Sequence, residues 1–236
     1  LDKKSSITIW DIAGKKVVKN VATDYPIGAF ILHQHYFIGA DKGGNIVFWD
    51  LENIEKQPAI IYRRYASPFY SIAYSDKGKH LVAGNSRGEV LYFQFNPANF
   101  HAGISPNLQA QIFTKKHLGV VASTTFSQDG NNMASAGLDG IVMLWDLKKI
   151  EKGKIDRIVP VRMDSQNQKV FSVAFDQHGK HVVFGGLNQL HIRPINIDQL
   201  YQKLRGRLEN TELAEAQWTY FRRGDLEKPQ RTTINK

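Results

Sequence analysis

The chain has 236 residues, 42% of them hydrophobic, which is enough for one globular domain with a substantial core. It contains no cysteine, and this excludes disulfides, thiol catalysis and cysteine-bound zinc. Its formal net charge of +9 is compatible with a nucleic-acid or other anionic partner.

Targeting and membrane segments are not expected in this chain. A strand pattern follows Leu1 to Lys4, where a signal peptide would have an apolar core. The longest uncharged apolar stretches, such as 120–126, are far shorter than the ~20 residues of a membrane span. Together with the missing cysteines, these features predict a cytoplasmic protein.

The chain opens on a strand pattern that then recurs. Residues 7–11 read Ile-Thr-Ile-Trp-Asp, and a more polar strand follows them at 16–21. The same apolar strand, ending in an aromatic residue, is expected at 46–50, 90–94 and 141–146, with the polar strand after it at 58–62, 108–113 and 158–162. The chain therefore begins inside a repeating unit.

Hairpins complete three of the later units. Residues 69–84, 121–136 and 171–185 align with one another as strand, tight turn and strand. Their turn glycines, Gly78, Gly130 and Gly179, recur at intervals of about 50 residues. In each turn an Asp-x-Gly or Gln-x-Gly group supplies a residue that tolerates positive φ. Each unit thus has four strands.

Four strands per unit, with Trp-Asp closing the third, resemble the WD-repeat family. The clearest unit runs from Lys116 to Asp146 and contains a His turn, Phe-Ser-x-Asp-Gly, Ala-Ser-Ala-Gly, Leu-Asp-Gly and Leu-Trp-Asp. The resemblance covers about residues 5–195. It implies an all-β fold, a β-propeller of four-stranded blades.

The resemblance divides the chain into a propeller region, 1–195, and a C-terminal extension, 196–236. The propeller would comprise a half blade at 5–22 and four blades near 26–63, 68–113, 118–162 and 168–193. A blade buries its faces only against neighbouring blades, so a partial ring leaves an exposed apolar flank. We expect upstream chain or another subunit to supply the missing blades.

The extension has helical periodicity. Apolar residues recur at helical spacing from Ile197 to Leu208, and a second helical stretch is expected over 211–221. This arrangement is similar to the C-terminal tail of bacterial WD-repeat proteins, although Arg193 and Gln217 replace the Trp and Glu of that pattern. The similarity implies the C-terminal part of a larger bacterial protein.

One unit carries the residues of a hydrolytic triad. In the family, the positions of His117, Ser135, Asp139 and Trp145 form a buried hydrogen-bonded tetrad, in which Trp donates to Ser, Ser to His and His to Asp. A triad also needs an exposed nucleophile and an oxyanion site, so we interpret these residues as structural. The other units have Gly39, Ala83 and Phe184 at the Ser position, which predicts that the tetrad blade is the stiffest.

Two further motifs suggest a ligand and are given structural interpretations. His33 and His35 are two positions apart, as on one face of a strand, but zinc needs a third protein ligand and none is expected nearby. Residues 39–44 are glycine-rich but lack the Gly-Lys-Ser/Thr spacing and following helix of a phosphate-binding loop. No metal and no cofactor are therefore predicted.

The resemblance places partner binding on the rim formed by the turns between second and third strands and the loops between blades. The residue before the tetrad Asp position faces this rim, and it is Lys42, Ser86, Leu138 or Leu187 in the four units. Their neighbours are Arg64, Tyr65 and Arg87. Leucines ringed by arginine and tyrosine suit a protein contact.

Three functions are compatible with these features. The leading hypothesis is a non-catalytic protein-interaction scaffold or sensor module. The second is a propeller that binds nucleic acid through its basic surface, which would make binding strongly salt-dependent. The third is an enzyme with a site in the central channel; the apolar or aromatic strand starts at Ile27, Tyr70, Val121 and Phe171 argue against it.

Overall fold

A computed structural model describes residues 5–23, 26–53, 58–63, 67–99, 108–150, 155, 158–165 and 168–195. The C-terminal extension expected over 196–236, with its two helical stretches, lies outside these residues, as do Arg64 and Tyr65. Among the described residues, no helix is long and apolar enough to cross a membrane.

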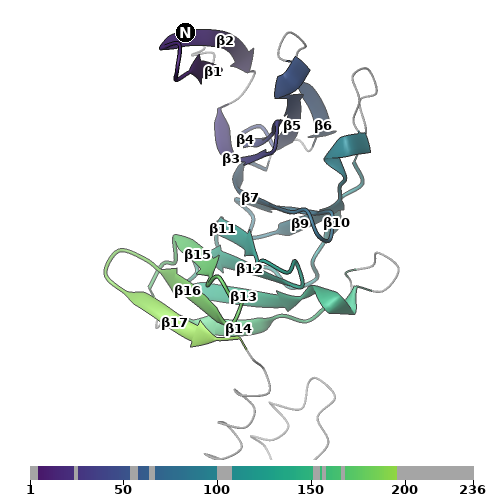
Figure 1. Cartoon of the computed structure of the whole chain (residues 1–236). Helices are drawn as coiled ribbons and strands as arrows, with labels where there is room; N and C mark the ends of the chain where they lie inside the picture. Colours follow the sequence, from purple (N-terminus) through teal and green to yellow (C-terminus); the bar gives the residue numbers. More distant parts are fainter. Residues whose placement is uncertain are drawn as a thin grey trace, which may run out of the picture. The chain divides into compact units, whose positions relative to one another are not determined.

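The described strands form sheets that follow one another along the chain (Figure 1). The first is a pair, β1 (Ser5–Asp11) and β2 (Lys16–Thr23). Three four-stranded antiparallel sheets follow. The first has β3 (Ile27–His33), β4 (Tyr36–Asp41), β5 (Asn45–Asp50) and β6 (Ala59–Arg63), and the second has β7 (Phe69–Ser75), β8 (His80–Asn85), β9 (Val90–Gln94) and β10 (Gln111–Ile112). The third has β11 (Val121–Phe126), β12 (Asn132–Gly137), β13 (Ile141–Asp146) and β14 (Val161–Asp164). The last sheet is β15 (Ser172–Phe175), β16 (His181–Gly185) and β17 (Leu190–Pro194). The predicted all-β architecture of four-stranded antiparallel sheets is confirmed.

Alternate residues of the middle strands pack against different neighbouring sheets. In β9, Leu91 and Phe93 join the core shared with β3–β6, whereas Val90 and Tyr92 join the core shared with β11–β14. Because successive side chains of a strand point to opposite faces, a strand buried on both faces reads as a continuous apolar run. The apolar third strands of the sequence pattern therefore lie between two cores.

The first strands of neighbouring sheets lie against one another. β3 contacts β7, β7 contacts β11, and β11 contacts β15. The fourth strands, β6, β10 and β14, are the opposite edges of their sheets (Figure 1). This arrangement, with first strands innermost and sheets packed face to face, is that of propeller blades.

Short 3-10 turns follow three of the third strands. They are η1 (Leu51–Asn53), η2 (Pro97–Asn99) and η3 (Leu147–Lys149). The Asp at the end of the third strand caps two of them: Asp50 accepts a hydrogen bond from the Glu52 backbone N–H, and Asp146 accepts one from that of Lys148. The Trp-Asp ending of the repeat thus marks the end of a strand and the start of a capped turn.

Some strand and turn details differ from the sequence expectations. The fourth strand expected at 158–162 pairs over 161–164, because Pro160 has no N–H for the ladder. The fourth strand expected at 108–113 pairs only at Gln111 and Ile112. In the first hairpin Lys79, and not Gly78, has positive φ (52°), whereas Gly130 and Gly179 have positive φ as expected.

Apolar side chains are exposed at both ends of the stack of described sheets. Trp10 at the end of β1 is 60% exposed, although the matching Trp49 and Trp145 are buried. In the last sheet Leu190 and Ile192 are exposed, and a hollow of about 540 Å³ lies over its face between Phe171 and Leu190. The tryptophan position that is buried between sheets in the other units is therefore uncovered at the first end of the stack.

Candidate functional site

The tetrad residues lie in one hydrogen-bonded chain inside the β11–β14 sheet. Trp145 Nε1–H donates to Ser135 Oγ over 3.1 Å, and Ser135 Oγ lies 2.9 Å from His117 Nε2. His117 Nδ1 is 3.1 Å from Asp139 Oδ1. Since the carboxylate only accepts, Nδ1 carries the proton and Nε2 accepts from the Ser135 hydroxyl. The side chains of the four tetrad residues thereby all have hydrogen-bond partners.

The same chain of contacts cannot serve as a hydrolytic triad. Ser135 is fully buried, and its hydroxyl lies between Trp145 and His117. A nucleophile must reach a substrate carbonyl, and this oxygen has no route to one. The geometry fits a structural relay that ties strands β12 and β13 to the loop before β11.

The β3–β6 sheet has the tryptophan of this pattern without its partner. Trp49 lies at the position of Trp145, and Gly39 stands where Ser135 does. Trp49 is 2% exposed, and its Nε1–H has no hydrogen-bond partner among the described residues. A buried donor without an acceptor costs about 1–3 kcal/mol. The two sheets therefore provide a natural comparison of the tetrad with and without its serine.

His117 makes the stability of the tetrad depend on pH. Burial lowers the pKa of His117 below its ordinary value of 6.5, and the nearby Asp139 carboxylate only partly offsets this. A histidine whose pKa is lowered by folding stabilises the fold above the unfolded pKa, and this contribution is lost as pH falls through the folded value. We therefore expect the urea midpoint to decrease as pH falls from neutrality to below 6.5.

Comparing two histidine variants checks this expectation. His117→Asn should have a shallower pH dependence than the wild type, because the titrating ring is gone. His178→Asn removes an exposed histidine in the β15–β16 turn and should keep the wild-type slope. Equal slopes for His117→Asn and the wild type would contradict the assignment.

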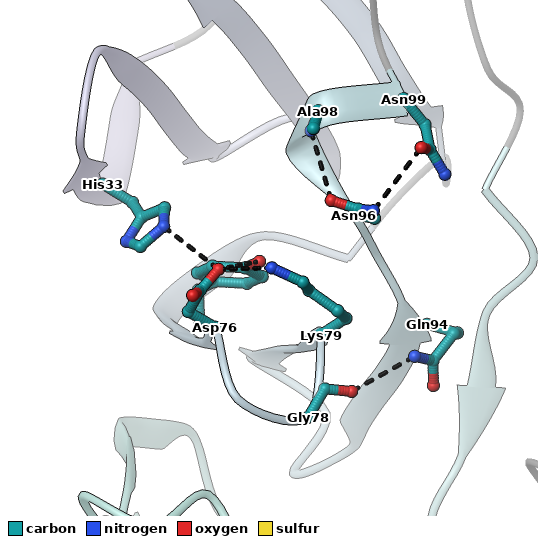
Figure 2. A network of polar contacts seen from close by, with 9 residues as sticks. His33, Asp76, Gly78, Lys79, Gln94, Asn96, Ala98 and Asn99 are labelled. Atoms are coloured by element: carbon teal, nitrogen blue, oxygen red, sulfur yellow. Dashed lines mark hydrogen bonds and ion pairs between the residues drawn. The ribbon is translucent and has the colours of Figure 1, made fainter.

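His33 and His35 do not form a pair on one strand face, contrary to the sequence expectation. His33 ends β3, whereas His35 and Gln34, which has a positive φ of 54°, form the turn that leads into β4. Figure 2 shows His33 directed at Asp76 of the next sheet, 3.3 Å away, beside the Lys79 ammonium at 2.6 Å from the same carboxylate oxygen. Hydrogen bonding to Lys79 is the main cause that lowers the pKa of Asp76. This contact ties two sheets together.

The expectation that no further ligand type lies near His35 is wrong. Its Nε2 is 3.8 Å from Asp50 Oδ1, and its Nδ1 is 3.5 Å from Glu52 Oε1. Asp50 lies at the end of β5 and Glu52 in η1, and the fold brings both carboxylates to His35. The spacing of these residues in the sequence does not reveal this contact. The two ring nitrogens of His35 face different carboxylates, and Asp50 also caps η1. His35 therefore bridges the side chains of Asp50 and Glu52.

Three of the rim residues occupy equivalent positions. The backbone N–H groups of Lys42, Ser86 and Leu138 donate to the carbonyls of Pro26, Pro68 and Val120, respectively, at 2.8–2.9 Å. Each carbonyl immediately precedes the first strand of the same sheet. Leu187 lies in the corresponding turn of the last sheet, where Gly186 N–H instead donates to the Gln189 carbonyl.

Backbone contacts make this rim continuous from one sheet to the next. His117 N–H donates to the Gly88 carbonyl over 2.9 Å, and Ser165 N–H donates to the Gly140 carbonyl over 3.0 Å. Asp139 Oδ2 also accepts the Leu118 N–H at 2.8 Å. The turn of one sheet therefore positions the loop that leads into the next. We call this end of the sheets the turn rim; it comprises the turns 42–44, 86–89, 138–140 and 186–189 and the described residues of the loops before β7, β11 and β15.

The exposure of the rim residues differs from the sequence expectation. Leu187 is 85% exposed, but Leu138 is only partly exposed. Sequence reasoning missed Leu118, which is 87% exposed on the loop that Asp139 holds. The position of Leu118 directly after His117, in the His turn of the repeat, was the sequence signal that could have placed it on an exposed loop. The strongly exposed leucines of the rim are thus Leu118 and Leu187.

The strand starts at the rim are mixed in character. Val121 is fully buried, while Tyr70 and Phe171 are 40% and 44% exposed. Lys42 Nζ lies over the Tyr70 ring, 3.1 Å from its centroid, and burial lowers the pKa of this lysine. A cation–π contact of this kind joins the first two four-stranded sheets at the rim.

Comparison with known proteins finds one clear repeat. Residues 109–146 match the family "WD domain, G-beta repeat", and this segment contains the whole tetrad. The matched segment also includes Leu118 and Leu138 of the turn rim.

Longer stretches are similar to eukaryotic proteins. The chain is 24% identical over 142 residues to "Target of rapamycin complex subunit wat1" of Schizosaccharomyces pombe, covering 59% of this chain and 44% of the relative. It is 27% identical over 157 residues to "Pre-mRNA-processing factor 19" of Oryza sativa subsp. japonica, covering 65% of this chain and 26% of the relative. The chain thus spans less than half the length of these relatives.

A solved structure shares the fold. A chain of "Crystal Structure of Mitotic Checkpoint Complex" superimposes with a TM-score of 0.63 at 17% identity, covering 81% of this chain and 55% of that one. At this identity the likeness concerns the fold alone. The comparisons support the WD-repeat family and a β-propeller-like fold.

Proposed function

We propose that this chain, with its stacked blades and one matched WD repeat, is a non-catalytic protein-interaction scaffold that binds partners on the turn rim. The observation that carries the proposal is the pair of leucines, Leu118 and Leu187, more than four-fifths exposed on loops that backbone hydrogen bonds hold in place. Large exposed apolar groups on a rigid frame are typical of protein-binding surfaces. The name of one relative, a complex subunit, agrees with a scaffold role.

The burial of the tetrad supports a non-catalytic role. The serine and histidine that resemble a triad are both inside the sheet. Their hydrogen bonds hold Asp139, and Asp139 holds the backbone of Leu118. The tetrad would thus contribute to function by fixing a loop of the rim.

The exposed apolar face of the last sheet supports packing against a further blade. Leu190 and Ile192 project from β17, and Phe171, Phe184 and Leu190 line the hollow beside them together with polar residues and Leu187 of the turn 186–189. We propose that further propeller blades, from the same polypeptide or another subunit, cover Leu190 and Ile192 on β17 and leave Leu187, at the rim end of the hollow, accessible. A sensor role and a place in a larger bacterial protein are hypotheses from the sequence; the relatives named above come from eukaryotes.

A display selection tests the rim proposal. Peptides selected for binding to the whole chain should lose affinity roughly tenfold when Leu118 and Leu187 are both changed to Ser, because such anchors carry much of the energy of an interface. Val159→Ser is the matched control, since Val159 is 67% exposed but lies away from the rim. If most selected peptides bind the double variant as tightly as the wild type, the turn rim is not the binding surface.

A further inference from the structure

The charged residues of the sheets β3–β17 are unequally divided between the two ends of the strands. At the turn rim the described basic residues outnumber the acidic ones: they are Lys42, Arg63, Arg87, Lys115, Lys116 and Lys169, against Asp41, Glu89, Asp139 and Asp164. At the opposite end, which we call the hairpin end, the acidic residues named here slightly outnumber the basic ones: they are Asp50, Glu52, Asp76, Asp129, Asp146 and Asp176, against Lys77, Lys79, Lys148, Lys180 and Arg193. The described positive charge therefore gathers at the rim.

Burial and hydrogen bonds occupy the carboxylates of three of the four acidic residues at the rim. Asp41 is 4% exposed and accepts from the backbone and side chain of Asn45. The Asp139 carboxylate is 7% exposed and bonded to His117 and Leu118. Glu89 accepts a hydrogen bond from Asn85 Nδ2 at 2.6 Å. The exposed charged residues described at the rim are Arg63, Arg87, Lys115, Lys116 and Lys169, against one exposed acid, Asp164, so the charge presented outward is mainly positive.

Exposed leucines and cations alternate along this part of the rim. The loop 115–118 presents Lys115, Lys116 and Leu118 in succession. Its backbone is tied to Gly88 on one side and Asp139 on the other. Lys169 precedes Phe171 beside the turn that carries Leu187, and the Lys169 carbonyl packs against Gly186. We call Arg87, Lys116, Leu118, Leu138, Lys169 and Leu187 the rim patch.

We infer that the rim patch binds an acidic protein segment that carries apolar side chains. This inference rests on the proposed function, because it names the partner chemistry for the same surface. Aspartate or glutamate side chains complement the exposed cations, and apolar side chains cover Leu118 and Leu187. The cations supply orientation and association rate, and the leucines supply most of the affinity.

The leucines distinguish this partner from a nucleic acid. A phosphate backbone is bound by lysine and arginine and gains nothing from contact with exposed leucine. Bases can stack on aromatic rings; at the rim the Tyr70 ring already carries the Lys42 ammonium, which leaves Phe171, 44% exposed, for stacking. An acidic peptide uses both the charged and the apolar members of the rim patch.

Fluorescence anisotropy with designed peptides tests the inference. The probe is a labelled peptide alternating glutamate with leucine, and two comparison peptides replace glutamate by glutamine or leucine by serine. A single-stranded oligonucleotide of equal charge is the fourth ligand. The whole chain should bind the glutamate–leucine peptide most tightly, and binding should weaken with salt because the charges are exposed.

Charge-reversed variants locate the site. The rim variant Lys116→Glu with Lys169→Glu should weaken binding of the probe by roughly tenfold, since like charges then face each other. The hairpin-end variant Lys77→Glu with Lys148→Glu makes the same change in net charge and should bind as the wild type does. Circular dichroism of both variants confirms that they are folded.

Several results would overturn the inference. These are equal affinity for the glutamine peptide, tighter binding of the oligonucleotide, equal losses in the two charge-reversed variants, or no binding of the probe. The display selection with the Leu118 and Leu187 variant distinguishes failure of this inference from failure of the proposed function. If selected peptides depend on Leu118 and Leu187 but the acidic probe does not bind, the rim is an interaction surface and only its acidic preference is wrong.

Discussion

Replacing Gly88 by alanine is expected to lower the free energy of unfolding by about 3–5 kcal/mol, a large effect for one methyl group. Gly88 has a φ of +78°, which favours glycine. A Cβ there would lie 2.0 Å from the His117 carbonyl oxygen and 2.7 Å from its carbon. These are backbone atoms of the next sheet's loop, so the turn and the loop must move apart and the 2.9 Å hydrogen bond between them is lost.

Gly179→Ala is the matched control for this substitution. Gly179 also has positive φ, +62°, but the nearest atom to its added Cβ is Ser127 Cβ at 3.7 Å, an ordinary contact. It should cost only the strain of a left-handed alanine, roughly 1–2 kcal/mol. Urea denaturation followed by circular dichroism gives both values. Equal losses would mean that the contact between the Gly88 turn and the His117 loop does not contribute to stability.

Trp145→Phe should destabilise the protein by about 1–3 kcal/mol more than Trp49→Phe does. Both substitutions remove a similar volume from a buried site, so their packing costs are comparable. Trp145→Phe also removes the donor to Ser135, whereas Trp49→Phe removes an N–H that has no partner in the part of the chain that the structure describes. The difference between the two variants therefore isolates the hydrogen-bonded chain.

Urea midpoints of the two phenylalanine variants give this comparison. The m-values should match that of the wild type, since neither change alters the compactness of the fold. A Ser135→Ala variant should reduce the gap between the two, because Trp145 then loses its acceptor in advance. Equal midpoints for Trp145→Phe and Trp49→Phe would contradict a stabilising role of the tetrad.

The repeat made much of the fold predictable. Apolar third strands ending in Trp-Asp placed β5 and β13, because a strand buried on both faces must be apolar throughout. Turn residues were less predictable. Lys79 adopts the left-handed conformation that the pattern assigned to Gly78, since local side-chain contacts, including that of Lys79 with Asp76, compete with backbone preference.

The candidate site was predictable only where the motif fixed it. The four tetrad residues share one motif, whereas the rim depends on which loop residues the neighbouring sheet covers. Leu138 and Leu118 are both apolar loop residues, but only the structure shows Leu118 to be the exposed one. In the same way, the carboxylates beside His35 come from the end of β5 and from η1. Whether they lie close to His35 depends on the register between β4 and β5.

Hydrogen–deuterium exchange with and without a bound peptide tests the central claim most directly. The claim is that a rigid stack of sheets presents its turn rim to a protein partner. Binding of a display-selected peptide should slow exchange in the backbone of 86–89, 116–120, 138–140 and 186–189 and leave the hairpin turns 76–79 and 128–131 unchanged. Slower exchange confined to the hairpin turns, or to none of these segments, would contradict the claim.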